Sequence, residues 1–257
     1  MKRIRTILVL LMLLTPAYAE ELAPPRAQVA AASPQITVPT MANNPGALGG
    51  IFKTKVVVFN PTAFAYPIQV TLYTINGLVD QKLINMSAGQ IRNYENFLEE
   101  VFAYTGAGAV NFDSLTIPGG NVNHLFLVNS EVYIDGPNGR FKTVVMNGIP
   151  LDPVSPGTNA YSTGVTQDSS NRVNIGCFNA SSLANIVVAE VYDSSNQLLK
   201  TVSITLTGGS WNQVPLGTAV TGGYILWKPT NIAYCYAVVV NNTSNDGSFI
   251  PAANYAP

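Results

Sequence analysis

The two cysteines are the residues of this chain whose chemistry is easiest to assign. Cys177 and Cys235 lie 58 residues apart, each within an apolar, β-branched run that predicts a strand. In an oxidising compartment we expect them to form a disulfide, worth about 4 kcal/mol for a loop of this length. The spacing invites comparison with the inter-sheet bridge of immunoglobulin domains. Two buried free thiols are the alternative.

His124 is the only histidine, and therefore the only imidazole base that the chain could use. A Ser-His-Asp site would need an activated serine, but the sequence has no Gly-x-Ser-x-Gly motif. Glu99 and Glu100 are adjacent, which turns them about 100° apart on a helix. We therefore expect no catalytic residues and no enzyme. A hydrolase centred on His124 is the enzymatic alternative.

Oxygen-bearing side chains gather in two predicted turns. They are Asp135, Asn138, Asn241, Asn242 and Asp246. Calcium binding would suit this donor set, but no twelve-residue loop with a terminal Glu is present. Asn and Asp also favour tight turns without an ion. We expect no metal site and no cofactor, and the sequence leaves calcium binding at these turns open.

Aromatic residues offer a binding surface of another kind. Trp211, Trp227 and Tyr161, together with Tyr224 and Tyr255, could form an exposed platform for sugar rings or a protein partner. Packing in the core or between domains is the alternative for the same residues.

The composition excludes several classes of protein. The 257 residues are 47% hydrophobic, so the chain can bury a core and is not disordered. Only 11% are charged, with 13 basic and 14 acidic residues. A nucleic-acid-binding protein needs a basic surface, which this balance does not provide.

The first residues have the pattern of a secretory signal peptide. Three basic residues stand among the first five, residues 7–14 are apolar, and Ala17-Tyr18-Ala19 matches a cleavage site. We expect residues 1–19 to be removed and the product to be secreted, in the periplasm, at the cell surface or outside the cell. The apolar run is too short to span a bilayer, so we expect no membrane span after processing.

The remaining chain predicts an all-β protein. We expect an extended linker over residues 20–48, in which Ile36-Thr37-Val38 could add a strand at a sheet edge. Two β-sandwich domains follow, over residues 49–152 and 160–257. The first carries a short helical insertion that Asn93 would cap.

An internal repeat supports this division. Residues 58–61 align with residues 177–180 at an offset of 119, and the same offset places residues 72–73 on residues 191–192. Two matches at one offset, within segments of about 100 residues each, indicate tandem copies of one unit.

Two motifs carry a resemblance to known proteins. They are the opening over residues 39–61, with Phe59-Asn60-Pro61, and the closing Phe249-Ile250-Pro251-Ala252. Residues 37–257 thus resemble uncharacterised secreted bacterial proteins with tandem Ig-like β-sandwich repeats. The resemblance implies two Ig-like sandwiches and no activity.

These observations favour an exported, non-enzymatic adhesion, binding or structural module that acts through strand edges and loops. An exposed Val-rich strand such as residues 238–240 could pair with another chain, and self-association would follow. The partner would be an extracellular protein or a glycan. The alternative is an accessory carbohydrate-binding protein that uses exposed aromatic residues.

Overall fold

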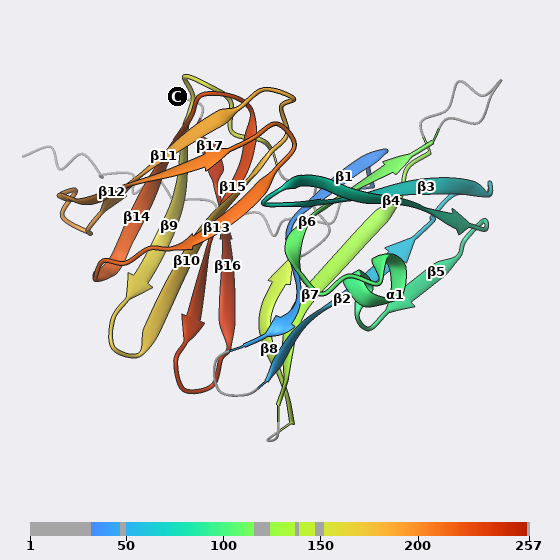
Figure 1. Ribbon diagram of the computed structural model, residues 1–257, viewed down its shortest axis with the longest axis horizontal. Helices are drawn as coiled ribbons and strands as arrows, with labels where there is room; N and C mark the ends of the chain where they lie inside the picture. Colours follow the sequence, from blue (N-terminus) through green and yellow to red (C-terminus); the bar gives the residue numbers. More distant parts are fainter. Residues whose placement is uncertain (1–31, 47–49, 116–123, 137–138, 147–151, 256–257) are drawn as a thin grey trace, which may run out of the picture.

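The protein is all-β, with one short helix (Figure 1). Every pairing between its strands is antiparallel in the described part of the chain. The predicted all-β class is therefore confirmed, whereas the predicted signal peptide lies outside the described residues. The computed structural model describes residues 32–46, 50–115, 124–136, 139–146 and 152–255.

The first half of the chain forms a single sheet. Its strands are β1 (Gln35–Pro45), β2 (Ile51–Phe59), β3 (Tyr66–Thr74), β4 (Gly77–Met86), β5 (Ile91–Tyr94), β6 (Gly106–Ser114), β7 (Leu127–Gly136) and β8 (Gly139–Met146). They pair in the order β4-β3-β6-β1-β2-β7-β8, and β5 pairs with β2. The helix α1 (Phe97–Phe102) follows β5 and contributes Phe97, Leu98 and Phe102 to the core.

The second half forms two sheets. Its strands are β9 (Asn159–Gln167), β10 (Asn171–Asn179), β11 (Asn185–Tyr192), β12 (Leu198–Leu206), β13 (Trp211–Pro215), β14 (Val220–Pro229), β15 (Ala233–Asn241), β16 (Gly247–Pro251) and β17 (Ala253–Tyr255). The middle sheet has the order β13-β10-β15-β16, and the outer sheet has the order β12-β11-β14-β9-β17. A core that includes Val173, Val187 and Trp227 lies between these two sheets.

The two halves share one pairing order. Apart from β17, each strand of the second half takes the place that the strand eight numbers earlier holds in the first half. The first half differs because β1 also pairs with β2, which joins its two parts into one sheet.

Local irregularities recur in both halves. The register shifts next to Tyr73 in β3 and next to Tyr192 in β11. In each case a glycine of the neighbouring strand, Gly108 or Gly223, lies against the carbonyl oxygen of that tyrosine. A Cβ atom would collide with the backbone there, so only glycine allows this approach.

A buried asparagine organises the loop that follows β2, and another organises the loop that follows β10. Each side-chain amide donates hydrogen bonds to backbone oxygens of two separate turns. The buried polar groups at the end of the strand therefore have hydrogen-bond partners. The donor distances are 2.7 Å from Asn60 to the Phe64 oxygen, 2.8 Å from Asn60 to the Ser87 oxygen, and 2.7 Å from Asn179 to the oxygens of both Leu183 and Thr207.

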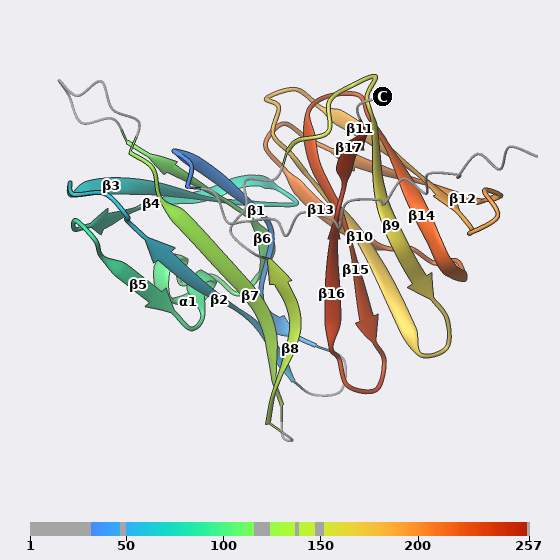
Figure 2. The same cartoon turned by 180° about the vertical axis from the view of Figure 1, so that it is seen from behind.

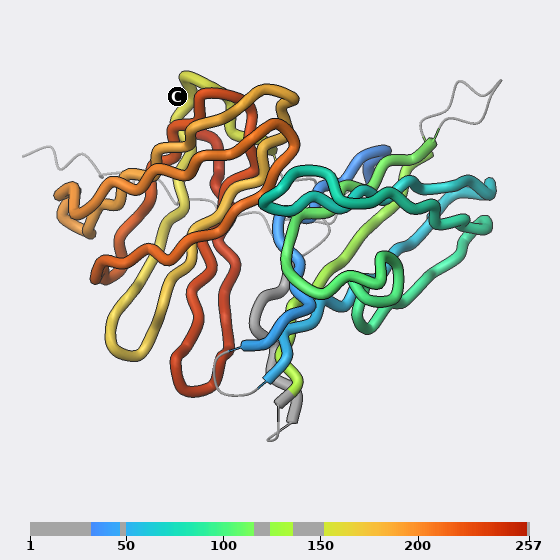
Figure 3. The backbone as a smooth tube through the Cα atoms, viewed as in Figure 1, coloured from blue at the N-terminus to red at the C-terminus, as the bar shows by residue number. Residues whose placement is uncertain are grey.

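The middle sheet is covered on both faces. Cys235 and Ala237 of β15 face the core of the second half, whereas Tyr236, Val238 and Val240 pack into the core of the first half. Figures 1 and 2 show β15 and β16 on the side of the second half that faces the first, and Figure 3 shows the two halves side by side. Such double burial explains the nearly continuous apolar sequence of β15.

Cys177 and Cys235 form the predicted disulfide. The two residues are directly opposite in the register of β10 and β15, with their Cα atoms 4.2 Å apart. The bridge therefore joins neighbouring strands of one sheet, and the comparison with an inter-sheet bridge is wrong. A disulfide is consistent with an oxidising, extracellular-type compartment.

Two local expectations have different outcomes. Residues 36–38 lie in β1 and pair with β6 alone, which agrees with the expected edge position, and β1 gains β2 as its second neighbour only at residues 43–45. Asn93 does not cap the helix, because it lies in β5 opposite Val57, and α1 begins only at Phe97. The first sheet thus begins within the stretch that the sequence suggests is a linker.

Candidate functional site

Four tyrosines form a row across the outer sheet, on the face turned away from the second core. They lie on four neighbouring strands, in the order Tyr192 on β11, Tyr224 on β14, Tyr161 on β9 and Tyr255 on β17. The Tyr192 and Tyr224 rings stack with centroids 4.9 Å apart and planes 11° apart. Tyr161 meets Tyr224 at 5.8 Å and Tyr255 at 6.5 Å, both edge to face. We call these four residues the tyrosine row.

The strand pattern places these side chains on one face. Adjacent residues of a strand point to opposite faces of the sheet. Ile225, next to Tyr224 in β14, and Val191, next to Tyr192 in β11, are fully buried in the core, so the two tyrosines lie on the outer face. Tyr255 is 63% exposed, and the other three rings are half-buried. Because strands lie about 4.8 Å apart, the row spans roughly 14 Å of surface.

Polar groups border the tyrosine row. The Glu190 carboxylate accepts hydrogen bonds from the Tyr192 hydroxyl at 2.8 Å and from Lys228 Nζ at 2.7 Å. The bond from Lys228, followed by that from Tyr192, lowers the pKa of the Glu190 carboxyl group. The Tyr224 hydroxyl donates to Asn196 in the turn between β11 and β12. Carboxylate, ammonium and hydroxyl groups thus stand beside the rings.

The two tryptophans do not belong to this surface. Trp227 is fully buried between the outer and middle sheets, where its Nε1 atom donates to Ser162 Oγ at 2.9 Å. Trp211 is 9% exposed and packs between the halves against Phe178 and Ala109. The expected platform of Trp211, Trp227 and Tyr161 is therefore corrected, because only Tyr161 lies on an accessible sheet face.

His124 is buried rather than presented to a substrate. Its ring stacks on Tyr66 with centroids 4.5 Å apart, and it is 7% exposed. Its Nδ1 atom has no hydrogen-bond partner among the described residues. No serine or carboxylate in that part of the chain is hydrogen-bonded to it, so the geometry of a Ser-His-Asp site is not present there.

The turn residues considered for calcium serve other roles. Asn241 Oδ1 accepts from the backbone N–H groups of Thr243 and Ser244, and Asn242 Oδ1 accepts from Arg172. Asp135 accepts from Lys53 at 3.0 Å. Asn138 lies outside the described residues. Within the described ranges, no group of three or more His, Cys, Asp or Glu residues is placed to hold a metal ion.

The Val-rich strand is not a free edge. β15 pairs with β10 on one side and β16 on the other, and Val238 and Val240 are buried against the first half. The expected pairing of this strand with another chain is therefore wrong. Two of the strands that end a sheet, β4 and β12, carry charged residues: Lys82 pairs with Asp80 at 2.9 Å, and Lys200 binds two carbonyl oxygens. Such features discourage edge-to-edge pairing.

Comparison with known proteins does not assign the chain to a family. No family model matches it, and no curated protein is similar to it. Among the helices of the described residues, none is long and apolar enough to cross a bilayer.

Proposed function

We propose that this protein is an exported, non-enzymatic binding module that holds a neutral, extended glycan against the tyrosine row. The observation that carries the proposal is the alignment of four tyrosine rings across four neighbouring strands on one open sheet face. Contact through a sheet face takes the place of the strand-edge contact that the sequence favours.

The chemistry of sugars fits this surface. A pyranose ring has an apolar face of C–H groups that packs on an aromatic ring, and hydroxyl groups around its rim that need hydrogen-bond partners. The tyrosine row supplies the rings, while Glu190 and Lys228 supply an acceptor and a donor beside them. These two charges pair with each other, which favours a neutral ligand over an acidic one.

We also propose that the two halves are tandem Ig-like sandwiches, as in the secreted bacterial proteins that the sequence resembles. The shared pairing order and the equivalent roles of Asn60 and Asn179 support a common unit. Export is supported by the signal pattern of residues 1–19 and by the disulfide.

Affinity electrophoresis of residues 20–257 in gels containing xylan, glucomannan or hydroxyethylcellulose tests the glycan proposal. We expect at least one polysaccharide to retard the protein. We expect Tyr255→Ala and Tyr161→Ala each to lower the affinity for that polysaccharide, obtained from the retardation, at least tenfold. Such a loss corresponds to about 1.4 kcal/mol for each ring removed. Phe64→Ala is the matched control, because Phe64 is also 63% exposed but lies in the first half.

Two outcomes would overturn the proposal. One is a wild-type protein that migrates freely in all three gels. The other is a Tyr161→Ala/Tyr255→Ala variant, folded by circular dichroism, that is retarded as strongly as the wild type.

A further inference from the structure

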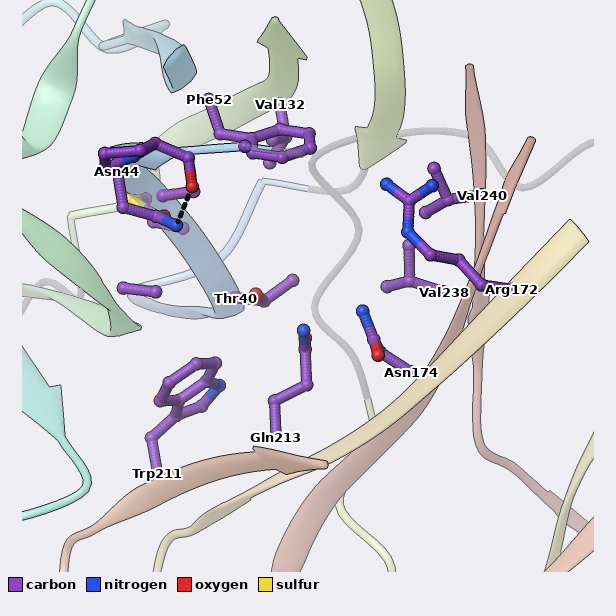
Figure 4. Close-up of a pocket in the computed structure, with 15 residues that line it drawn as sticks. Thr40, Asn44, Phe52, Val132, Arg172, Asn174, Trp211, Gln213, Val238 and Val240 are labelled. Carbon is purple, nitrogen blue, oxygen red and sulfur yellow. Dashed lines mark hydrogen bonds between the residues drawn. The ribbon is translucent and has the colours of Figure 1, made fainter. Parts of the chain in front are cut away.

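A cavity of about 280 Å³ lies between the two halves, away from the tyrosine row. One wall is the N-terminal strand β1 with the neighbouring Phe52 and Val132, and the opposite wall is the face of the middle sheet. Figure 4 shows side chains from both walls around this space. The middle sheet thus turns a partly polar face toward this cavity.

Three polar side chains of the middle sheet line the cavity. Arg172 and Asn174 are two residues apart on β10, and so project from the same face, and Gln213 projects from the neighbouring β13 (Figure 4). The lining residues include no aspartate or glutamate. A cationic group thus faces the cavity without an anion beside it.

Arg172 is held by neutral partners. Its two terminal nitrogens donate to Asn242 Oδ1 at 3.2 Å and to Asn245 Oδ1 at 3.0 Å, and it makes no ion pair with any described residue. Burial lowers the pKa of its guanidinium group. A guanidinium group has five N–H donors, so the two amide bonds leave others for a ligand.

The amides of the lining are also oriented as donors. Trp211 Nε1 donates to the Tyr236 hydroxyl at 3.0 Å, and that hydroxyl donates to Gln213 Oε1 at 3.0 Å. The relay occupies the acceptor of Gln213 and leaves its Nε2 hydrogens free to donate. Asn174 has no side-chain hydrogen bond to any residue in the described ranges, so its amide is also available.

We propose that this cavity binds a sugar acid, with its carboxylate on Arg172. Two oxygens of a carboxylate match the fork of a guanidinium group, and a charge-assisted pair in a partly buried site is stronger than one in water. Asn174, Gln213 and Thr40 reach the hydroxyl groups, while Trp211 and Val238 cover the apolar part. The volume is that of a small ligand, close to the lower limit of ordinary ligand pockets.

The ligand could be a free sugar acid or the terminal residue of an acidic polysaccharide, because both present the same carboxylate and hydroxyl groups. This inference does not depend on the tyrosine row, which lies on the opposite sheet of the second half.

Isothermal titration calorimetry of the full exported chain with D-glucuronate tests the proposal. We expect binding of about 1 mM or tighter, no detectable heat from D-glucose, and at least a tenfold loss of affinity in Arg172→Gln. Arg92→Gln is the matched control, because Arg92 is also half-buried but lies on β5. Tyr255→Ala should bind glucuronate normally.

A second variant guards against a folding artefact in Arg172→Gln. Asn174→Asp keeps Arg172 and adds a carboxylate beside it, so we expect it to lose glucuronate binding without losing thermal stability. Galacturonan oligomers that bind as tightly as free galacturonate would identify a polysaccharide end as the ligand, and binding of the free acid alone would identify a free sugar. Both results support the site.

Three results would overturn the inference. They are no heat from glucuronate, unchanged affinity in Arg172→Gln, and equal affinity for glucuronate and inorganic phosphate, which would indicate a general anion site instead.

Discussion

Single buried amides hold the loops of this protein in place. Asn179 is fully buried, and its Nδ2 group donates to two backbone oxygens while its Oδ1 atom accepts from the Ser181 N–H group. No side chain of another type offers both donors and an acceptor at that position with the same shape. The residue therefore determines how two turns meet at the end of β10.

Asn179→Asp is the most selective test of this role. The substitution keeps the shape but places a carboxylate oxygen against two carbonyl oxygens, so we expect a loss of about 3 kcal/mol or more in the free energy of unfolding. Urea denaturation measures it, with Asn212→Asp on the half-buried β13 as the control. A change below about 1 kcal/mol would contradict the role assigned to Asn179.

Asp113 gives the stability a dependence on pH. Burial raises the pKa of its carboxyl group. Between the ordinary and the raised pKa, the native state therefore holds a proton that the unfolded state has already released. The free energy of unfolding therefore falls as the pH rises from the ordinary carboxyl pKa through the raised one. We expect Asp113→Asn to be more stable than the wild type at pH 7 and equally stable near pH 3. Thermal melts across this pH range measure the effect, and Asp152→Asn at an exposed position is the control. Melting temperatures of Asp113→Asn and wild type that differ by the same amount at every pH would contradict the prediction.

At the scale of elements, β10 and β15 are the centre of the molecule. Nine residue pairs join them, from Asn171 opposite Asn241 to Asn179 opposite Ala233, and the disulfide lies within that ladder. Gly176 is needed in β10 because the Tyr236 phenol lies directly over it, where a Cβ atom would collide with the ring. Both strands contribute apolar side chains to the second core, and β15 alone contributes them to the first.

Removing the disulfide should weaken this pair without changing the fold. For the Cys177→Ala/Cys235→Ala variant we expect a loss of about 4 kcal/mol in the free energy of unfolding, because the unfolded chain regains the freedom of a 58-residue loop. Guanidinium denaturation measures the loss. A double variant that is as stable as the oxidised wild type would show that the bridge is not a source of stability.

The sequence predicts some elements well and others poorly, for identifiable reasons. Alternation in Val202, Ile204 and Leu206 marks β12, which the structure contains. β4 is hard to predict because Asp80, Gln81 and Lys82 interrupt the pattern on an exposed strand. β9 is hard to predict because few of its residues are large and apolar.

β1 shows how short the reach of a local rule is. Pro39 suggests a sheet edge because proline cannot donate to a ladder. In the structure Pro39 stands where β1 pairs with β6 alone, at the register shift between Val38 and Met41, and β1 becomes a central strand only from Asn43, where β2 joins it. Sequence periodicity does not reveal which proline coincides with such an irregularity.

The candidate sites could be predicted only in part. Tyr161, Tyr224 and Tyr255 are recognisable as aromatic candidates, but Tyr224, Leu226 and Trp227 give β14 apolar residues on both faces. The sequence thus does not show that Trp227 points inward. No sequence motif surrounds Arg172. It lines a cavity only because the first half packs opposite it, and this packing cannot be read from the sequence.

At the scale of the whole molecule, the middle sheet makes the two halves depend on each other. Tyr236, Val238 and Val240 belong to the first core although they lie in the second half of the sequence. Separating the halves would expose this apolar face to water, at about 25 cal/mol for each Å² of apolar surface. We therefore expect the two halves to unfold as one cooperative unit.

Differential scanning calorimetry tests that cooperativity. We expect the intact protein to unfold in one transition, and Val238→Asp to lower the temperature of the whole transition, because a charge then faces the first core. Ile186→Asp, on an exposed position of the outer sheet, should leave it nearly unchanged. Two transitions, of which Val238→Asp moves only one, would show that the halves unfold separately.

The position of the disulfide also determines how the molecule would respond to tension. A force on the two ends of the chain reaches Cys177 and Cys235 and passes directly through the covalent bridge, so β11, β12, β13 and β14 bear none of it. The enclosed 58-residue span would add about 200 Å if it could be extended. While the bridge is oxidised, a pull cannot extend this length, so β11 and β14 with Tyr192 and Tyr224 stay folded back even when the first half has been drawn out. Tyr161 on β9 and Tyr255 on β17 lie outside the enclosed loop, so tension would divide the tyrosine row between its protected and its unprotected strands.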